Sequence, residues 1–535
     1  MELNPLKTCY RASLPINLPP EACFVYRSSN NMCPHLPSSP LTEVCNFDCD
    51  LPSQDVVIVG NMRTNEYILI GALTANRSMT YFLVRKRSGR LREVLIEQPD
   101  IKPDEAPEQL MIKKGDDWRQ LLKEYGAASA TAMGVKPINP KDNLVGYCTW
   151  YYYYADVSEK NFLDNVDALA AHPDSRYGHG VAQIDDGYQT FQGDWLDQDA
   201  SWPTPLEKIA QDTIAKGLVP GIWLMPMCAS TASRTFKEHP DWFVMDDKGE
   251  PLVFQGWSPE PNHLWLCLDP TLPAVREHLT SVFQTFWKWG FRYFKMDGLG
   301  FGLPQGRRHA PNATPVSAFR LALKTIRKAV PVAYLLGCCP PFMACLGFCD
   351  GCRVSPDTSR GWSCPSPVAT GDEHPMTCSI RSAYHSTIAN WWMFDRWFRA
   401  DPDTLMARQD NAWYTLGEAR ISVLTGILTG VTVTSDNLAT IAPERMKLLD
   451  LAANTRMKDL QPFDCKPFVW TRTWEGTIDG KRAVAIFNDT DSAKEYTLES
   501  LGLKPGAVEI LQNAGTVCDH VRLEAHDAML LVARD

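Results

Sequence analysis

The chain has 535 residues, and its 53 lysines and arginines against 63 aspartates and glutamates give a net charge of −10. A chain of this length is too long for one compact core and favours a large central domain with smaller companions. No basic stripe stands out that could neutralise phosphates, so nucleic acid and anionic membranes are poor candidate partners.

Targeting signals are not evident in the sequence. Met1 to Pro20 lack the basic start and the apolar run of a secretory signal. No stretch approaches the apolar length that crosses a bilayer. We therefore expect a soluble, cytoplasmic protein.

The 17 cysteines are odd in number and scattered along the chain, which favours reduced thiols over a disulfide framework. The densest group includes Cys345, Cys349 and Cys352, of which Cys349 and Cys352 form a CxxC motif. No second CxxC and no HxxxH motif accompanies it to complete a zinc site. We expect buried thiols that pack as small hydrophobic groups, with no metal and no cofactor; a structural metal is the alternative.

Residues 1–110 are predicted to form a β-sandwich. Apolar runs at Val56 to Val59, Tyr67 to Ile70 and Met79 to Val84 are separated by residues typical of turns.

A helical linker, 111–142, is predicted to follow. Trp118, Leu121, Leu122 and Tyr125 share one helical face, and Gly126 is the expected stop.

Residues 143–450 alternate short apolar strands with helical segments, the pattern of parallel βαβ units. The predicted strands are Leu144 to Trp150, Gly180 to Asp185, Val219 to Met225, Phe291 to Asp297, Ala333 to Cys338, Gly351 to Ser355, Arg396 to Ala400, and Val431 to Ser435. The helix before the fourth strand is the clearest, with an apolar stripe from Val275 to Phe286 and Gly290 as its end. Eight such repeats predict a (β/α)8 barrel, the TIM barrel fold, in which catalysis occurs at the carboxyl ends of the strands.

The tail, 451–535, returns to strand patterning. Phe468 to Trp474 and Arg482 to Asn488 flank Asp479-Gly480, a hairpin turn signal. We predict a small antiparallel β-domain, so that the fold class is a multidomain α/β protein with a central barrel.

Carboxylates dominate the positions where predicted barrel strands end. Asp185 and Asp186 follow the second strand, Asp297 ends the fourth, and Asp357 follows the sixth. No comparable set of His, Cys and Ser occurs there, which argues against acyl transfer. Two carboxylates across a sugar-sized cavity are what glycoside hydrolysis requires.

The sequence motifs around these carboxylates also resemble those of a known family. Residues 143–440 resemble glycoside hydrolase family 36, the microbial α-galactosidases of clan D, in the content and order of their motifs. The matching motifs are Asp185 to Tyr188 with Gly193 to Trp195, Gly221 to Trp223, Lys295 to Asp297, Arg353 to Asp357 with Trp362, and Asp401 to Asp403.

The resemblance implies an N-terminal β-supersandwich and a retaining enzyme that removes terminal α-linked galactose without a cofactor. Asp297 would be the nucleophile, kept ionised by Lys295 on the same strand face. Asp357 would be the general acid and then the base, so it has to be protonated before the attack.

The remaining candidate site residues would bind the sugar. The resemblance assigns Asp185 and Asp186 to the 4- and 6-hydroxyls, and a salt bridge at the barrel rim is the alternative for one of them. Trp150 and Trp223 would pack on the apolar sugar face or in the core. Arg353 would orient a hydroxyl or Asp357, or pair with another acid. Further candidates are Cys338 near the 2-hydroxyl, and Trp195 and Trp362 at the aglycone, each with simple packing as the alternative.

The sequence departs from the family pattern near the pocket, at Gly298, at Cys338-Cys339 and at Ala400. The exact sugar is therefore open. The alternatives are an α-N-acetylgalactosaminidase, because Gly298 and the cysteine segment would enlarge or reshape the pocket, a galactosyl transferase of the raffinose-synthase type, and a non-catalytic sugar-binding barrel. The family's tendency to oligomerise makes a homo-oligomer an expectation here.

Overall fold

The computed structural model of the chain describes residues 8–16, 23–28, 39–43, 49–88, 90–138, 143–255, 264–363, 378–463, 471–512, 515–518 and 520–534. By the density of internal contacts the chain divides into two compact units. The first contains residues 1–136, 185–212 and 221–352, and the second contains 137–184, 213–220 and 353–535.

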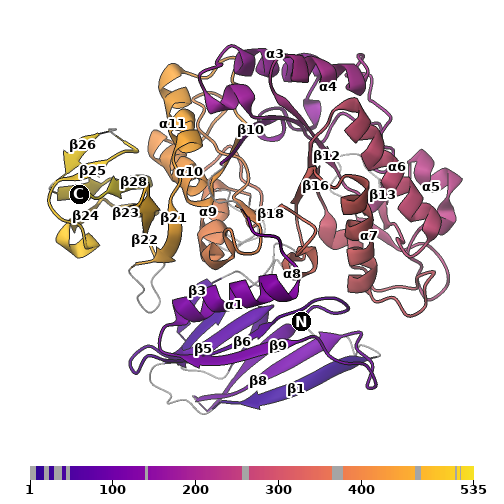
Figure 1. Cartoon of the computed structure of the whole chain (residues 1–535), viewed down its shortest axis with the longest axis horizontal. Coiled ribbons are helices and arrows are strands. Elements are labelled where there is room, and N and C mark those ends of the chain that lie inside the picture. The colour runs from indigo at the N-terminus through magenta and orange to yellow at the C-terminus, as the bar shows by residue number, and fades with distance from the viewer. Residues whose placement is uncertain are drawn as a thin grey trace. The chain divides into compact units, whose positions relative to one another are not determined.

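The N-terminal part is a β-sandwich of two antiparallel sheets (Figure 1). One sheet has the order β1-β8-β7-β4, with β1 Cys9–Pro15, β8 Arg90–Pro99, β7 Tyr81–Arg87 and β4 Cys49–Gln54. The other has the order β3-β2-β5-β6-β9, with β3 Ser39–Glu43, β2 Cys23–Arg27, β5 Val56–Asn61, β6 Glu66–Ala72 and β9 Leu110–Gly115. Val57, Val59 and Ile70 of one sheet pack with Phe82, Val84 and Val94 of the other, and this apolar layer stabilises the sandwich.

Helix α1, Trp118–Ala132, lies against β6 and β9. Its buried face contains the predicted Trp118, Leu121, Leu122 and Tyr125, but the predicted stop at Gly126 is wrong. The helix continues for six residues because Ala127 to Ala132 are mostly good helix formers, and Gly126 is itself buried on the packed face. The left-handed turn falls at Gly134, with φ 70°.

The central sheet is parallel and confirms the predicted (β/α)8 barrel. Its eight strands have the order β19-β18-β17-β16-β12-β11-β10-β20. They are β10 Leu144–Cys148, β11 Val181–Ile184, β12 Val219–Leu224, β16 Tyr293–Met296, β17 Tyr334–Gly337, β18 Gly351–Arg353, β19 Arg399–Asp401 and β20 Val431–Thr434. In the first unit β12, β16, β17 and β18 pair in register, and in the second β11, β10 and β20 do so.

All eight predicted strands exist, but several are shorter. The first ends at Cys148, because Trp150 begins the short helix α2, Trp150–Tyr153. The seventh begins at Arg399 instead of Arg396, since Asp395 takes a positive φ of 56° that interrupts extended structure.

The other helices follow the barrel pattern. They are α3 Glu159–Ala170, α4 Leu206–Ala215, α5 Arg234–Glu238, α6 Pro273–Trp289, α7 Pro315–Ala329, α8 Phe342–Cys345, α9 Ile380–Ala389, α10 Leu416–Thr429 and α11 Pro443–Asn454. Helix α6 buries the predicted stripe and ends at Gly290, with φ 115°. The sequence did not indicate a small antiparallel sheet, β13 Cys228–Ser230, β15 Leu264–Cys267 and β14 Val253–Gln255, between β12 and α6.

The C-terminal part is antiparallel, as predicted. A sheet of order β21-β22-β23-β28-β25-β26 is accompanied by the pair β24-β27. Its strands are β21 Lys458–Pro462, β22 Thr473–Ile478, β23 Lys481–Asn488, β24 Lys494–Thr497, β25 Ala507–Glu509, β26 Thr516–Cys518, β27 His520–Leu523 and β28 Asp527–Val532. The hairpin turns at Asp479-Gly480, both with positive φ. Its first strand begins at Thr473, and residues 468–470 of the predicted strand lie outside the described residues.

Among the described residues no helix is both long and apolar enough to span a membrane. The division into four domains, with bounds at 110, 142 and 450, stays a prediction.

Candidate active site

Two acidic residues stand directly after β11. Asp185 and Asp186 are both buried, and Gly187 follows them with φ 111°, a conformation that favours glycine. The Asp186 amide donates to Oδ1 of Asp185 over 3.0 Å. This turn fixes both carboxylates at the carboxyl end of a barrel strand.

Asp297 follows β16 and is partly exposed. The indole Nε1 of Trp223 donates to its Oδ2 over 3.0 Å, and the amide of Gly298 donates to its Oδ1 over 2.7 Å. Both carboxylate oxygens therefore accept from N–H groups, which hold the side chain in one orientation while leaving it accessible.

Lys295 lies on β16, two residues before Asp297. Its Nζ forms a buried ion pair with Oδ2 of Asp185 at 2.8 Å. Asp185 thus has the salt bridge that the sequence allowed for one of the two acids. A buried pair of this kind is costly to break, because the remaining charge would lack a partner.

Asp186 has a different environment. Its Oδ1 accepts from Nε2 of Gln189 over 2.5 Å. Burial raises the pKa of Asp186 to about 6; the hydrogen bond from Gln189 opposes this shift, and the charges of Asp185 and Asp297 add to it. Gln189 was not singled out from the sequence, although it stands directly after the Asp-Asp-Gly-Tyr motif.

The other predicted residues of this group are buried. Trp223, expected to stack on a sugar, is 1% exposed and turns its indole N–H to Asp297. Trp195 packs edge-on against Trp223, with ring centroids 5.8 Å apart. Cys338 is buried directly after β17, and its amide donates to the carbonyl of Met296 over 2.8 Å.

A second group of polar residues belongs to the other unit. Asp357 follows β18 with its side chain 38% exposed, and Nη2 of the buried Arg353 lies 2.5 Å from its Oδ1. Nη1 of Arg353 lies 3.4 Å from Oδ1 of Asp403. Arg353 therefore contacts Asp357 and also pairs with a second, buried acid. The sequence had offered these two contacts as alternatives.

Asp403 is a buried acceptor that the sequence analysis did not include among the site residues. Its Oδ2 accepts from the amide of Thr358 over 2.8 Å and from the hydroxyl of Tyr151. Asp403 thus contacts both Arg353 and the residue next to Asp357. The signal available in the sequence was the Asp401-Pro402-Asp403 motif, which carried no assigned role.

The two remaining tryptophans are held by neighbouring rings. Trp150 begins α2, is partly buried and packs edge-on against Tyr154 at 5.4 Å. Trp362 is 8% exposed and stacks on His526, with ring centroids 5.0 Å apart.

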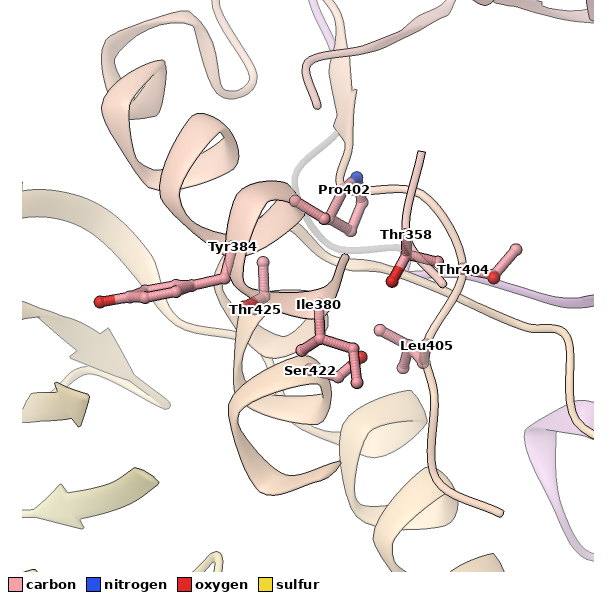
Figure 2. A pocket seen from close by; sticks show the side chains of 9 residues that line it. Thr358, Ile380, Tyr384, Pro402, Thr404, Leu405, Ser422 and Thr425 are labelled. Atoms are coloured by element: carbon pink, nitrogen blue, oxygen red, sulfur yellow. The ribbon is translucent and has the colours of Figure 1, made fainter. Parts of the chain in front are cut away.

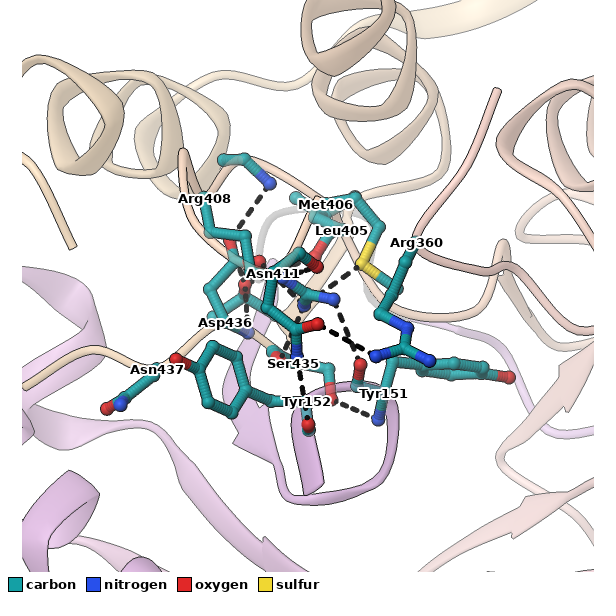
Figure 3. A network of polar contacts seen from close by, with 12 residues as sticks. Tyr151, Tyr152, Arg360, Leu405, Met406, Arg408, Asn411, Ser435, Asp436 and Asn437 are labelled. Carbon is teal, nitrogen blue, oxygen red and sulfur yellow. Dashed lines mark hydrogen bonds and ion pairs between the residues drawn. The ribbon is translucent and has the colours of Figure 1, made fainter. Parts of the chain in front are cut away.

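A buried ion pair supports the loops of the second unit. Arg408 Nη1 lies 3.3 Å from Oδ1 of Asp436, and its Nη2 donates to the carbonyl of Tyr151 over 3.0 Å (Figure 3). Nε of Arg408 also donates to the carbonyl of Asn411 over 3.2 Å. Burial raises the pKa of Asp436, and the charge of Arg408 opposes that effect.

A small cavity is lined in part by Thr358, the residue after Asp357 (Figure 2). It is lined by Thr358, Ile380, Ala383, Tyr384, Pro402, Thr404, Leu405, Ser422 and Thr425. Within the described residues none of the predicted site residues lines it, so it is not the expected sugar pocket.

The fold is a (β/α)8 barrel, and carboxylates follow several of its strands. A family model described as Melibiase matches residues 168–256. An α-galactosidase structure from Thermus thermophilus, in complex with p-nitrophenyl α-D-galactopyranoside, is 22% identical, with a TM-score of 0.67 and coverage of 89% of this chain and 92% of that chain. A family 36 α-galactosidase structure from Geobacillus stearothermophilus has a TM-score of 0.62 at 10% identity and covers 98% of this chain and 76% of its own.

Sequence similarity to curated relatives extends over shorter parts of the chain. The "A type blood alpha-D-galactosamine galactosaminidase" of Flavonifractor plautii is 28% identical over 139 residues, 25% of this chain and 13% of its own length. Alpha-galactosidase 1 of Pediococcus pentosaceus is 22% identical over 249 residues, 44% of this chain and 32% of its own length. The chain thus spans less than a third of the length of these relatives. Together the comparisons confirm the resemblance to glycoside hydrolase family 36 and support the predicted class of enzyme, an α-galactosidase-type glycoside hydrolase.

Proposed function

We propose that this chain is a retaining glycoside hydrolase that removes terminal α-linked galactose from oligosaccharides or glycoconjugates by double displacement. The observation that carries the proposal is Asp297, an accessible carboxylate directly after β16 with each oxygen held by an N–H donor. A nucleophile needs both properties: a fixed direction of attack and access to the sugar.

The chemistry divides between two aspartates. The Asp297 carboxylate attacks the anomeric carbon, and the glycosidic C–O bond breaks as Asp357 gives its proton to the leaving oxygen. Water then attacks the covalent intermediate while Asp357 takes a proton back, which releases the sugar with its α-configuration retained. Arg353 holds the carboxyl group of Asp357 in one direction, and its positive charge suits the second step, in which Asp357 acts as an ionised base.

The galactose-binding end of the pocket is assigned to Asp185 and Asp186. Galactose and glucose differ in the direction of the 4-hydroxyl, so a carboxylate that accepts from the axial hydroxyl would be left unpaired by glucose. Such a loss costs roughly 1 to 3 kcal/mol, or about fivefold to 150-fold in specificity.

A 2-amino or 2-acetamido galactoside is a second candidate substrate, favoured by the name of the Flavonifractor plautii relative. Gly298 gives this candidate no support. It has a φ of 58°, and an added Cβ would lie 2.4 Å from Cε of Met225, so the space that glycine leaves is filled by methionine. A larger pocket at the 2-position would need to come from other residues.

The test is the catalytic efficiency on nitrophenyl α-glycosides of galactose, N-acetylgalactosamine, galactosamine and glucose. We expect a galacto-configured substrate to exceed the glucoside at least about tenfold, and Asp297→Ala to lower turnover by roughly three orders of magnitude or more while the fold is kept. Asp186→Ala is expected to reduce the galacto-to-gluco ratio. A preference for glucoside, or wild-type turnover by Asp297→Ala, would overturn the proposal.

A carbohydrate is accordingly the proposed binding partner. The cytoplasmic location and the homo-oligomer stay predictions.

A further inference from the structure

Three buried cysteines outside the proposed catalytic groups face one another. The Sγ atoms of Cys345, Cys349 and Cys352 all lie within 4.8 Å of each other. All three are free thiols, and Cys349 is the most exposed of them at 9%. A single point between them is therefore within reach of every sulfur.

The backbone brings the three residues together through a tight turn. Cys345 ends α8, and its carbonyl accepts from the amides of Phe348 and Cys349 over 3.1 and 3.2 Å. Gly347 makes the turn with φ 85°, where an added Cβ would lie 2.7 Å from the carbonyl oxygen of Met133. Cys352, the middle residue of β18, completes the cluster from the neighbouring strand.

Two of the sulfurs pack against Gly337, the last residue of β17, which has no side chain. An added Cβ at Gly337 would lie 3.3 Å from Sγ of Cys352 and 3.4 Å from Sγ of Cys349. Gly337 therefore leaves room for two of the three sulfurs beside β17.

We propose that Cys345, Cys349 and Cys352 bind one thiophilic cation, with zinc as the expected ion, as a structural centre. Thiolates are the preferred ligands of such ions, and a Zn–S bond of about 2.3 Å places two sulfurs of a tetrahedral site about 3.8 Å apart. Sulfurs already within 4.8 Å reach that separation through small side-chain movements. Three protein ligands leave the fourth position to a small ligand.

The charges around the cluster suit a bound cation. Because thiolates are the ligating form of cysteine, binding would release thiol protons to the solvent. Zinc with three thiolates has a net charge of −1, which Arg320 near Cys345 offsets.

A disulfide is the competing use of these residues. It would join two of the sulfurs and leave the third as a thiol, whereas one cation uses all three. The metal would connect the end of α8 to β18, so its removal is expected to lower thermal stability and not to stop the reaction directly.

The test is the metal content of the full chain, produced with zinc in the medium and purified under reducing conditions. We expect about one zinc per chain, a loss of at least about tenfold in Cys349→Ser, and full content in Cys267→Ala, a buried cysteine on β15 that serves as the control. One equivalent of copper in place of zinc would support the same site for a different thiophilic ion.

A titration of the wild-type protein keeps the proposal testable if Cys349→Ser does not fold. After metal removal and reduction, Co²⁺ should produce a thiolate-to-cobalt charge-transfer band that saturates at one equivalent and disappears when zinc is added. A metal-free wild type with no such band would overturn the proposal. So would a disulfide within the cluster of the metal-free protein, seen as a mass lower by two hydrogens.

Discussion

At the scale of single residues, Asp186 shows how burial and one hydrogen bond set a protonation state. Its carboxyl group is buried next to two other acids, and its raised pKa of about 6 lies close to neutral pH. If the ionised form accepts from a sugar hydroxyl, protonation below that pH removes the acceptor.

We predict that kcat/KM falls as the pH drops through about 6, because that parameter reports the free enzyme's groups. Gln189→Leu should shift this acidic limb to higher pH, since the hydrogen bond from Gln189 stabilises the ionised form. The pH profiles of the wild type and the variant provide the measurement. An unchanged limb, or a shift to lower pH, would rule out Asp186 as the titrating group.

At the scale of elements, the loop after β19 supports the loop after β18. Asp403 accepts from Tyr151 and Thr358 and lies beside Arg353, so one buried carboxylate positions the residues on both sides of Asp357. We regard Asp403 as a positioning residue for the proposed acid.

Asp403→Asn is predicted to lower kcat on raffinose by roughly tenfold to a hundredfold, with a much smaller loss on a dinitrophenyl galactoside. An aryl leaving group needs little protonation, so a misplaced acid affects it least. Equal losses on both substrates would indicate a general structural role instead.

The sequence predicted these elements better than their contacts. Most barrel strands are short apolar runs that alternate with helical segments, and this pattern located all eight strands. The predicted end of helix α1 at Gly126 was wrong because helix propensity is a weak preference, which packing against the sandwich overrides.

The side-chain partners required the structure. That Trp223 donates to Asp297 depends on the pairing of β12 with β16, and that Asp403 contacts Arg353 depends on a loop 50 residues away in sequence. Neither partner follows from residue spacing. The acids themselves were visible because Asp185, Asp186 and Asp297 come at the ends of apolar strands and Asp357 comes four residues after β18.

For the molecule as a whole, buried ion pairs hold in place the loops that follow the barrel strands. The pair of Arg408 and Asp436 is fully buried and ties residues from the ends of β10 and β20 to the loop after β19. Such a pair is a weak source of stability in itself, but its disruption leaves one charge buried without a partner.

Asp436→Ala is therefore predicted to lower the free energy of unfolding by about 3 to 5 kcal/mol. The matched control is Asp164→Ala, which breaks the exposed pair with Lys160 and should cost at most about 0.5 kcal/mol. Denaturant unfolding of both variants gives the comparison. Similar small losses would show that Arg408 finds other partners after the substitution.

The central claim for the whole molecule is double displacement through Asp297, and it is tested most directly by the anomer that the enzyme releases first. NMR spectra recorded during rapid hydrolysis of an aryl α-galactoside should show the α-anomer of galactose first, with the β-anomer appearing later through mutarotation. Initial release of the β-anomer would contradict retention, and with it the role of Asp297 as the nucleophile.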